Sequence, residues 1–289
     1  MLQFNLRPLS YVILFYFVSA FGSVAQEMDW KYFEQHNDFS NTSLRQYDQS
    51  HIAKCIFGCG NYKPYEFAIE DNGNQFIVLR SKQGQLAQFN NQKKTIKDRI
   101  ELGTPNNKAK FNIDGETIWY GFRVKLPSGV NKLNSEEIMF SQMKQILKDT
   151  NKKDCHYQPM FKIKVRKDLT TYYKVINRKN DKLAKGDLSR LNENWSKFIV
   201  GMYFDKSNGW IKIYQNGKLK KHFKGPTLYD PKPKDCKVRD GSTNYIRIGV
   251  YRGTEKNAVG GDYANKYDEL HFDDFIISKS QENVIQALK

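Results

Sequence analysis

The chain of 289 residues has little cysteine, little histidine and, after its first 25 residues, no apolar stretch long enough to span a bilayer. It also lacks any long amphipathic helix pattern, any repeat period and any linker that would divide it. These absences favour one domain over residues 26–289, with no membrane partner. We expect a monomer.

The first 25 residues have the pattern of an export signal. Arg7 provides a positive start, an apolar run follows from Tyr11 to Phe21, and Ser23-Val24-Ala25 matches a small-x-small cleavage site. An uncleaved anchor is the alternative, although the run is short for that purpose. No cysteine stands near the cleavage site, which argues against a lipoprotein. In either case we expect the body of the protein outside the cytoplasm, secreted or periplasmic.

All four cysteines follow this segment, where an oxidising environment favours disulfides. Four cysteines allow three pairings. We expect Cys55 to pair with Cys59 across a tight loop and Cys155 to pair with Cys236 across two distant loops. A metal site is the rival interpretation, but no histidine stands at ligand spacing from the first pair. The prediction is therefore disulfides and no metal.

Acidic residues are in deficit: 47 Lys and Arg stand against 31 Asp and Glu, which gives a formal charge of +16. Loss of one cation, Arg7, with the signal would leave +15. A basic exported protein meets anionic polysaccharide, anionic envelope or nucleic acid. The simpler alternative is that the lysines only keep the protein soluble, and charge alone does not decide.

From about residue 64 the chain is a series of short alternating segments separated by Gly, Asn, Asp and Pro. Many short, evenly spaced strands predict an all-β sandwich or jelly roll. Asn216-Gly217 is a strong hairpin signal. The expected strands are 65–70, 75–80, 98–102, 118–127, 137–146, 160–167, 171–177, 197–204, 209–223 (with the hairpin turn), 245–252 and 270–278.

Several of these strands carry a basic or amide-bearing face opposite an apolar one. Such faces are either ordinary solvent faces or the lining of a charged concave groove. The candidates for the groove are Arg99 with Glu101, Arg123 with Lys125, Gln142 with Lys144, and Lys162 with Lys164 and Arg166.

The segment "NYIRIGVYRG" is the most informative strand. Ile246, Ile248 and Val250 share one face and predict a core. The other face carries Tyr245, Arg247, Gly249 and Tyr251. Exposed tyrosines rarely align with a glycine unless a ligand lies above them, so this row predicts a binding surface.

Taken in order, "DRIEL", "WYGFRVKLP", "FSQMKQ" and "NYIRIGVYRG" resemble segments of the β-jelly-roll polysaccharide lyases, the group of alginate, glucuronan and heparin lyases. The resemblance spans roughly residues 64–278. That group typically has an Arg-x-Glu-x-Arg strand, a Gln-Ile/Val-His strand and a Tyr-Phe-Lys-Ala-Gly-x-Tyr strand facing one groove.

The match to those three motifs is partial. Arg99 and Glu101 match the first, with Gly103 in place of the second arginine, and Gln142 matches the second, with Lys144 in place of histidine. The third is matched by Tyr245, Arg247, Gly249 and Tyr251, with arginine in place of lysine. Trp119 and Phe122 in "WYGFRVKLP" are expected to pack in the structure.

The resemblance implies β-elimination on a polymer that contains uronic acid. The site must neutralise the carboxylate while the C5 proton is removed, and Gln142 with Arg99 or Arg247 suits that role. Tyr251 suits the acid that protonates the leaving oxygen, and in a syn elimination its tyrosinate would also be the base. Gly249 is interpreted as leaving room for the sugar.

The base is left open because lysine, whose ordinary pKa is roughly 10.4, is mostly protonated where histidine is not. Neighbouring cations and burial could lower the pKa of Lys144. Otherwise Lys144 holds the carboxylate and the base is Tyr251 or a histidine such as His51 or His156. No cofactor is expected, and a structural calcium ion at Asp273 and Asp274 is left open.

Other functions fit less well. A jelly roll that binds anionic carbohydrate without turnover is the main alternative, because the lysine at 144 could mark lost catalysis. A glycoside hydrolase would need two carboxylates across the groove, and "DELHFDDF" is a poor match to that need. Export and disulfides argue against nucleic acid as a partner.

Overall fold

The computed structural model describes residues 65–82, 99–103, 115–145, 159–178, 181–228, 244–252 and 267–289. The predicted signal segment and all four cysteines lie outside these residues. The described parts form the following strands and helix: β1 Tyr65–Ile69, β2 Gln75–Lys82, β3 Arg99–Gly103, β4 Thr117–Lys125, β5 Glu137–Gln145, β6 Phe161–Arg166, β7 Thr170–Arg178, β8 Asp181–Arg190, β9 Ser196–Tyr203, β10 Gly209–Gln215, β11 Lys218–Gly225, β12 Asn244–Arg252, β13 Tyr267–Ser278 and α1 Gln281–Ala287.

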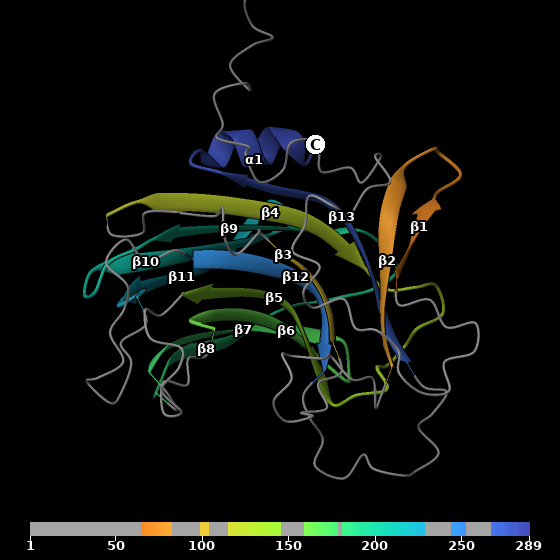
Figure 1. Cartoon of the computed structure of the whole chain (residues 1–289), viewed down its shortest axis with the longest axis horizontal. Coiled ribbons are helices and arrows are strands. Elements are labelled where there is room, and N and C mark those ends of the chain that lie inside the picture. Colours follow the sequence, from red (N-terminus) through yellow and green to blue (C-terminus); the bar gives the residue numbers. More distant parts are fainter. Residues whose placement is uncertain are drawn as a thin grey trace, which may run out of the picture.

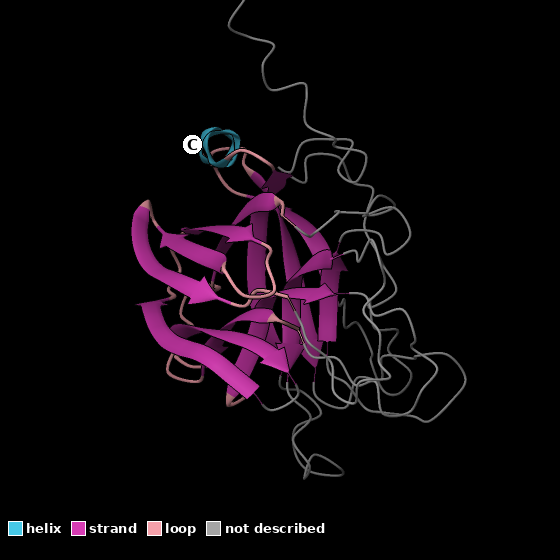
Figure 2. Cartoon of the chain, turned by 90° about the vertical axis from the view of Figure 1, so that its left-hand side faces the viewer, coloured by secondary structure: helices cyan, strands magenta, loops and turns pink. Residues whose placement is uncertain are grey.

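The strands form two antiparallel sheets that pack face to face (Figures 1 and 2). The seven-stranded sheet has the order β1-β2-β13-β4-β9-β10-β11, and the six-stranded sheet has the order β3-β12-β5-β6-β7-β8. The predicted all-β jelly-roll sandwich is confirmed. Several neighbours in the sheets are distant in sequence, so segments that the chain separates by more than 100 residues line one surface.

The core lies between the sheets and follows the predicted alternation. Ile246, Ile248 and Val250 are fully buried in it, as are the apolar residues of β6. Phe122 belongs to this core and is stacked on Phe198 with 5.5 Å between ring centroids. Each strand therefore turns its remaining side chains to the outer face of its sheet.

Helix α1 covers part of the outer face of the seven-stranded sheet, above β4 and β13 (Figure 1). Ser280 caps its first turn by accepting a hydrogen bond from the Asn283 backbone. Val284 and Leu288 then pack on a second apolar cluster that includes Trp119. A Cβ atom at Gly121 would lie 2.6 Å from Val284, so glycine is needed for this close packing.

Two elements escaped the sequence prediction. Strand β8 contains Asp, Lys, Ala and Gly, which have low strand propensity. It forms an antiparallel ladder with β7, and the Tyr173 ring lies over Gly186, where a Cβ atom would be 2.8 Å from that ring. Helix α1 is too short to show a periodic pattern. Of the helices in the described ranges, none is long and apolar enough to cross a membrane.

Candidate active site

On the outer face of the six-stranded sheet, three of the predicted site residues, Arg247, Gln142 and Lys162, lie in one row. Antiparallel pairing places directly opposite residues on the same face. Five strand pairs connect the residues of this row. From β3 to β8 they are Gly103, Arg247, Gln142, Lys162, Lys174 and Lys185.

At one end of this row, three polar side chains form a buried cluster. Gln142 donates from Nε2 to Glu101 Oε1, and Arg247 Nη1 lies 3.9 Å from Glu101 Oε2. Gln142 is fully buried, and Glu101 and Arg247 are each only 2% exposed. The cluster comes from the three strands that the motifs identified, so three short sequence signals converge at one place.

The amide of Gln142 is not saturated by its neighbours. Among the described residues, no donor reaches its Oε1 atom, although that atom is buried. A buried acceptor without a hydrogen bond costs roughly 1–3 kcal/mol. Such costs persist at sites where a ligand supplies the missing partner, so this atom marks the cluster as a candidate binding point.

Tyr251 and Lys144 are the more accessible neighbours of the cluster, and each is half-buried. In the register, Arg99 pairs with Tyr251, and Tyr245 pairs with Lys144. Only the backbones of Arg99 and Tyr245 fall within the described part of the chain. The five predicted motif positions at 99, 142, 144, 245 and 251 thus lie on adjacent strands.

The structure gives a reason for glycine at position 249 that the sequence did not suggest. Its φ is +150°, and a Cβ atom there would collide with the Ile100 carbonyl oxygen and lie 2.7 Å from Glu101 Cα. The glycine therefore permits close approach of β3, beside a register shift between β12 and β5. The interpretation of Gly249 as space for a sugar stays a prediction.

The middle of the row is strongly basic. Burial, followed by the charges of Lys164 and Lys174, lowers the pKa of Lys162 to about 8. Burial and the charges of Lys164, Lys185 and Lys182 also lower the pKa of Lys174. Neighbouring cations thus disfavour the charged forms of Lys162 and Lys174. The six-stranded sheet therefore carries concentrated positive charge.

One edge of this basic area is compensated. Burial alone would raise the pKa of Glu137, but hydrogen bonds from Lys164 and Tyr172 hold it below its usual value. Arg166 pairs with Asp187 at 2.6 Å and lies over the Tyr172 ring. Lys164 and Arg166 thus have carboxylate partners, and the charge of Glu137 also favours the charged form of Lys162.

Arg123 and Lys125, predicted as groove residues, do not join this surface. Both lie on β4 in the other sheet, on its outer face. Arg123 pairs with Asp273 and Asp274, and Lys125 pairs with Glu70. Alternation along the strand correctly indicated an outward basic face, but it does not tell which sheet a strand joins.

The possible calcium ligands lie in this same network. Burial and the charge of Asp274 raise the pKa of Asp273 to about 7, against the opposing effect of Arg123. Over the described ranges, no group of three or more His, Cys, Asp or Glu side chains could hold a metal ion. His51 and His156, the candidate bases, fall outside those ranges.

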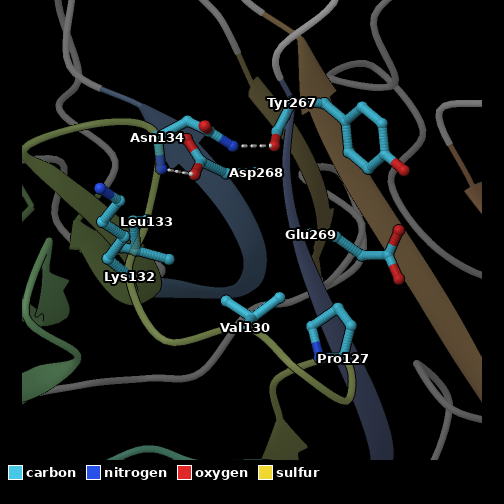
Figure 3. Close-up of a pocket in the computed structure, with 8 residues that line it drawn as sticks. All are labelled: Pro127, Val130, Lys132, Leu133, Asn134, Tyr267, Asp268 and Glu269. Atoms are coloured by element: carbon cyan, nitrogen blue, oxygen red, sulfur yellow. Dashed lines mark hydrogen bonds between the residues drawn. The ribbon is translucent and has the colours of Figure 1, made fainter.

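A separate pocket of about 410 Å³ lies between the β4–β5 loop and the start of β13 (Figure 3). Asp268 in its wall accepts hydrogen bonds from Asn134 and Ser135 and pairs with Arg252 at 3.1 Å. Arg252 belongs to the six-stranded sheet and Asp268 to the seven-stranded one. The pocket wall therefore connects the two sheets, and the Asp268 carboxylate is already paired with Arg252.

Comparison with known proteins agrees with the motifs. Residues 39–275 match the model of a family described as polysaccharide lyase. No functionally curated protein matches the chain.

Solved structures of similar fold include an endo-β-1,4-glucuronan lyase from the fungus Trichoderma reesei, at 13% identity and a TM-score of 0.53, covering 82% of this chain and 96% of that one. An alginate lyase from Pseudomonas aeruginosa matches at 14% identity and a TM-score of 0.47, covering 75% and 87%. One from a Chlorella virus matches at 10% identity and 0.48, covering 76% and 90%. The family match over most of the length is decisive: this chain belongs to the polysaccharide lyase family.

Proposed function

We propose that the protein is exported and cleaves a polysaccharide that contains uronic acid by β-elimination. The observation that carries this proposal is the convergence of Gln142, Arg247 and Tyr251 on neighbouring strands of one basic sheet face. A uronate needs cationic and amide donors beside a proton donor, and this face combines them.

In the proposed reaction a base removes the C5 proton, and the electrons of the C5–H bond form a C4–C5 double bond. The bond from C4 to the linking oxygen breaks, and that oxygen leaves with its electron pair and takes a proton. Negative charge grows on the C5 carboxylate in the transition state, where fixed donors are most effective. Arg247 and the second Nε2 hydrogen of Gln142 are the donors assigned to it.

Tyr251 is assigned to the leaving oxygen because its phenol shares a sheet face with the buried cluster. It is also only half-buried, so a substrate can reach it. Lys144 remains either base or carboxylate anchor, and Tyr251 as tyrosinate remains the other candidate base. Glu101 is assigned a positioning role, since it binds Gln142 and lies beside Arg247. With lysine or tyrosine as base, the reaction is expected to favour alkaline pH.

The direct test is to incubate the protein with alginate, polyglucuronate, heparin and chondroitin and to follow ultraviolet absorbance of the new double bond. We expect cleavage of at least one of these polymers. Tyr251→Phe should lower kcat about 100-fold or more while binding persists, because proton transfer typically contributes that much.

Lys144→Ala separates the two roles of the lysine. Loss of a carboxylate anchor raises KM, whereas loss of the base lowers kcat. A wild-type protein that binds these polymers but yields no unsaturated product would contradict the lyase proposal and favour a carbohydrate-binding protein without turnover.

A further inference from the structure

A second group of aromatic side chains lies on the outer face of the seven-stranded sheet, on the other side of the sandwich from the Gln142 cluster. Helix α1 packs on β13, β4 and β9. Next to it, strands β9 and β10 turn Tyr203, Trp210 and Tyr214 outward, and all three are half-buried. These three residues, together with Lys212 and Lys224, are called the aromatic strip below.

The aromatic strip rests on a fixed base. A Cβ atom at Gly201 would lie 2.4 Å from the Trp119 ring, so that ring lies directly over β9. Trp210 and Tyr214 pack on Trp119, with 5.7 and 6.3 Å between ring centroids. Because helix α1 and the sheet hold this base, the outer rings need little further ordering when a ligand binds, which lowers the entropy cost of binding.

Packing alone does not explain the outer layer of rings. Tyr203 is not part of the apolar cluster around Trp119, yet its ring lies within 20° of parallel to that of Trp210, with 6.5 Å between centroids. The face of an aromatic ring carries partial negative charge, which attracts the slightly positive C–H groups of a sugar. Two nearly parallel, half-exposed rings are therefore suited to a carbohydrate chain.

Positive charge lies beside these rings. Lys212 Nζ is 5.1 Å from the centroid of the Trp210 ring, and Lys224 pairs with Trp210 across β10 and β11. In the described part of the chain, neither lysine pairs with a carboxylate. Partial burial, followed by the charges of both lysines, lowers the pKa of the neighbouring His222. A carbohydrate bound here should therefore carry acidic groups.

We infer that the aromatic strip is a second binding site for an anionic polysaccharide, separate from the catalytic face. Its rings stack on sugar rings, and Lys212 and Lys224 bind the acidic groups. The site holds one segment of polymer while another segment occupies the Gln142 cluster, so it raises the affinity for long chains and not the rate of the chemical step. The choice of polymer rests on the proposed function, whereas binding at the strip does not require β-elimination.

The test compares a long polymer with a tetrasaccharide of the same polymer, which is too short to reach both sites. The polymer is the one among alginate, polyglucuronate, heparin and chondroitin that the wild type binds most tightly. We expect Lys212→Ala/Lys224→Ala to bind the long polymer about tenfold more weakly at low salt. Its kcat/KM on the tetrasaccharide should stay within about twofold of the wild type. Trp210→Ala should show the same pattern, with thermal unfolding to verify that each variant is folded.

The matched control is Lys218→Ala/Lys221→Ala, which removes the same charge from β11. The control lysines pair with Gln215 and Ile213, which are buried between the sheets, so they point away from the strip. Equal losses in the control and in Lys212→Ala/Lys224→Ala would mean that net charge explains the affinity. No loss in either variant, or no binding of any of the four polymers, would also overturn the inference. Tighter binding to phosphatidylglycerol vesicles than to the polymers would assign the strip to a membrane surface instead.

The two proposals fail separately in these experiments. Polymer binding that depends on the strip, without any unsaturated product, would refute the lyase reaction and keep the second site. Cleavage by a strip variant whose affinity for the long polymer is unchanged would refute the second site and keep the reaction.

Discussion

The outer faces of the two sheets differ in how closely their cations cluster with one another. On the seven-stranded sheet, outward cations of β2, β4 and β13 meet carboxylates. The pairs are Arg80 with Glu66 and Glu269, Arg123 with Asp273 and Asp274, Lys125 with Glu70, and His271 with Glu269. On the six-stranded sheet, Lys162, Lys174 and Lys185 face one another along a row.

The paired cations of the seven-stranded sheet stabilise the fold, whereas the proposed substrate lies against the clustered cations of the six-stranded sheet. A compensated network is stable without a ligand, whereas clustered charges of one sign lower stability until a polyanion arrives. Sites of function often carry such a cost. The comparison therefore predicts that substitutions on the two faces change stability in opposite directions.

The largest effect is expected from Arg123→Ala on the compensated face. Asp273 is fully buried and Asp274 is 16% exposed, so removal of the arginine leaves two close carboxyls without their cation. Breaking a buried pair costs about 3–5 kcal/mol, and partial exposure of Arg123 places the expected loss near about 2–4 kcal/mol. Urea unfolding measures it.

The double variant Arg123→Ala/Asp273→Asn is the control, because it removes the orphaned buried charge as well. It should recover part of the lost stability. Both variants should keep kcat/KM on the polymer substrate within about twofold at temperatures where they are folded. A selective rise in KM would place Arg123 in the substrate site and break the comparison.

The next effect has the opposite sign: Lys162→Met should stabilise the fold. Its pKa of about 8 lies below the ordinary lysine value of 10.5. A shift of that size corresponds to roughly 3 kcal/mol before solvent screening, so a gain of about 1–2 kcal/mol is expected at pH 7. Affinity for the polyanion should fall in the same variant, which unfolding and binding assays measure together.

The pH dependence follows from the direction of this shift. Between about pH 8 and 10.5 the unfolded chain binds more protons at Lys162 than the folded protein does, so the penalty disappears as pH rises through this window. The stability advantage of Lys162→Met should be full below pH 8 and vanish near pH 10.5. If the extra stability of Lys162→Met did not change with pH, its cause would be better packing and not the removed charge.

Sequence patterns alone could not predict most of this contrast between the two sheets. Alternation predicted the outward faces of β4 and β6 equally well, because both carry apolar and basic residues in turn. Only the sheet order shows that Arg123 meets Asp273, 150 residues away, while Lys162 meets Lys174. The motif residues Gln142, Arg247 and Tyr251 were predictable because each motif lies within one strand.

No motif in the sequence identified Lys174 and Lys185 as members of the row. Strand β7 was predicted, but its register was not, and β8 was not predicted at all, since its composition disfavours a strand. The burial of Gln142 and Glu101 was equally hidden, because hydrogen bonding between β5 and β3 depends on a third strand between them. Register and sheet order come from contacts that local sequence patterns do not encode.

A smaller effect is expected at Asp273, whose pKa is raised to about 7. Between about pH 4 and 7 the folded protein binds more protons at this carboxyl than the unfolded chain, so its contribution to stability falls as pH rises through that range. Asp273→Asn keeps an acceptor for Arg123 and should remove this slope. The shift of the pKa from 3.8 to about 7 corresponds to roughly 4 kcal/mol against the charged carboxylate. Loss of the ion pair with Arg123 offsets most of this, so a gain in stability of about 1 kcal/mol is expected at pH 7. Unfolding at several pH values measures it, and an unchanged slope would assign the effect to another group.

The smallest effect is expected from the exposed lysines of β11, in the variant Lys221→Ala/Lys224→Ala. This strand is the edge of the seven-stranded sheet, and these two side chains are exposed to solvent. Their charges lie in water and should change the free energy of unfolding by less than about 0.5 kcal/mol. An edge without charge pairs more readily with another edge, so self-association measured by light scattering should rise instead. A large stability change would mean that exposed lysines also carry a folding cost, and the contrast between the two sheets would then not be specific to the row at Lys162.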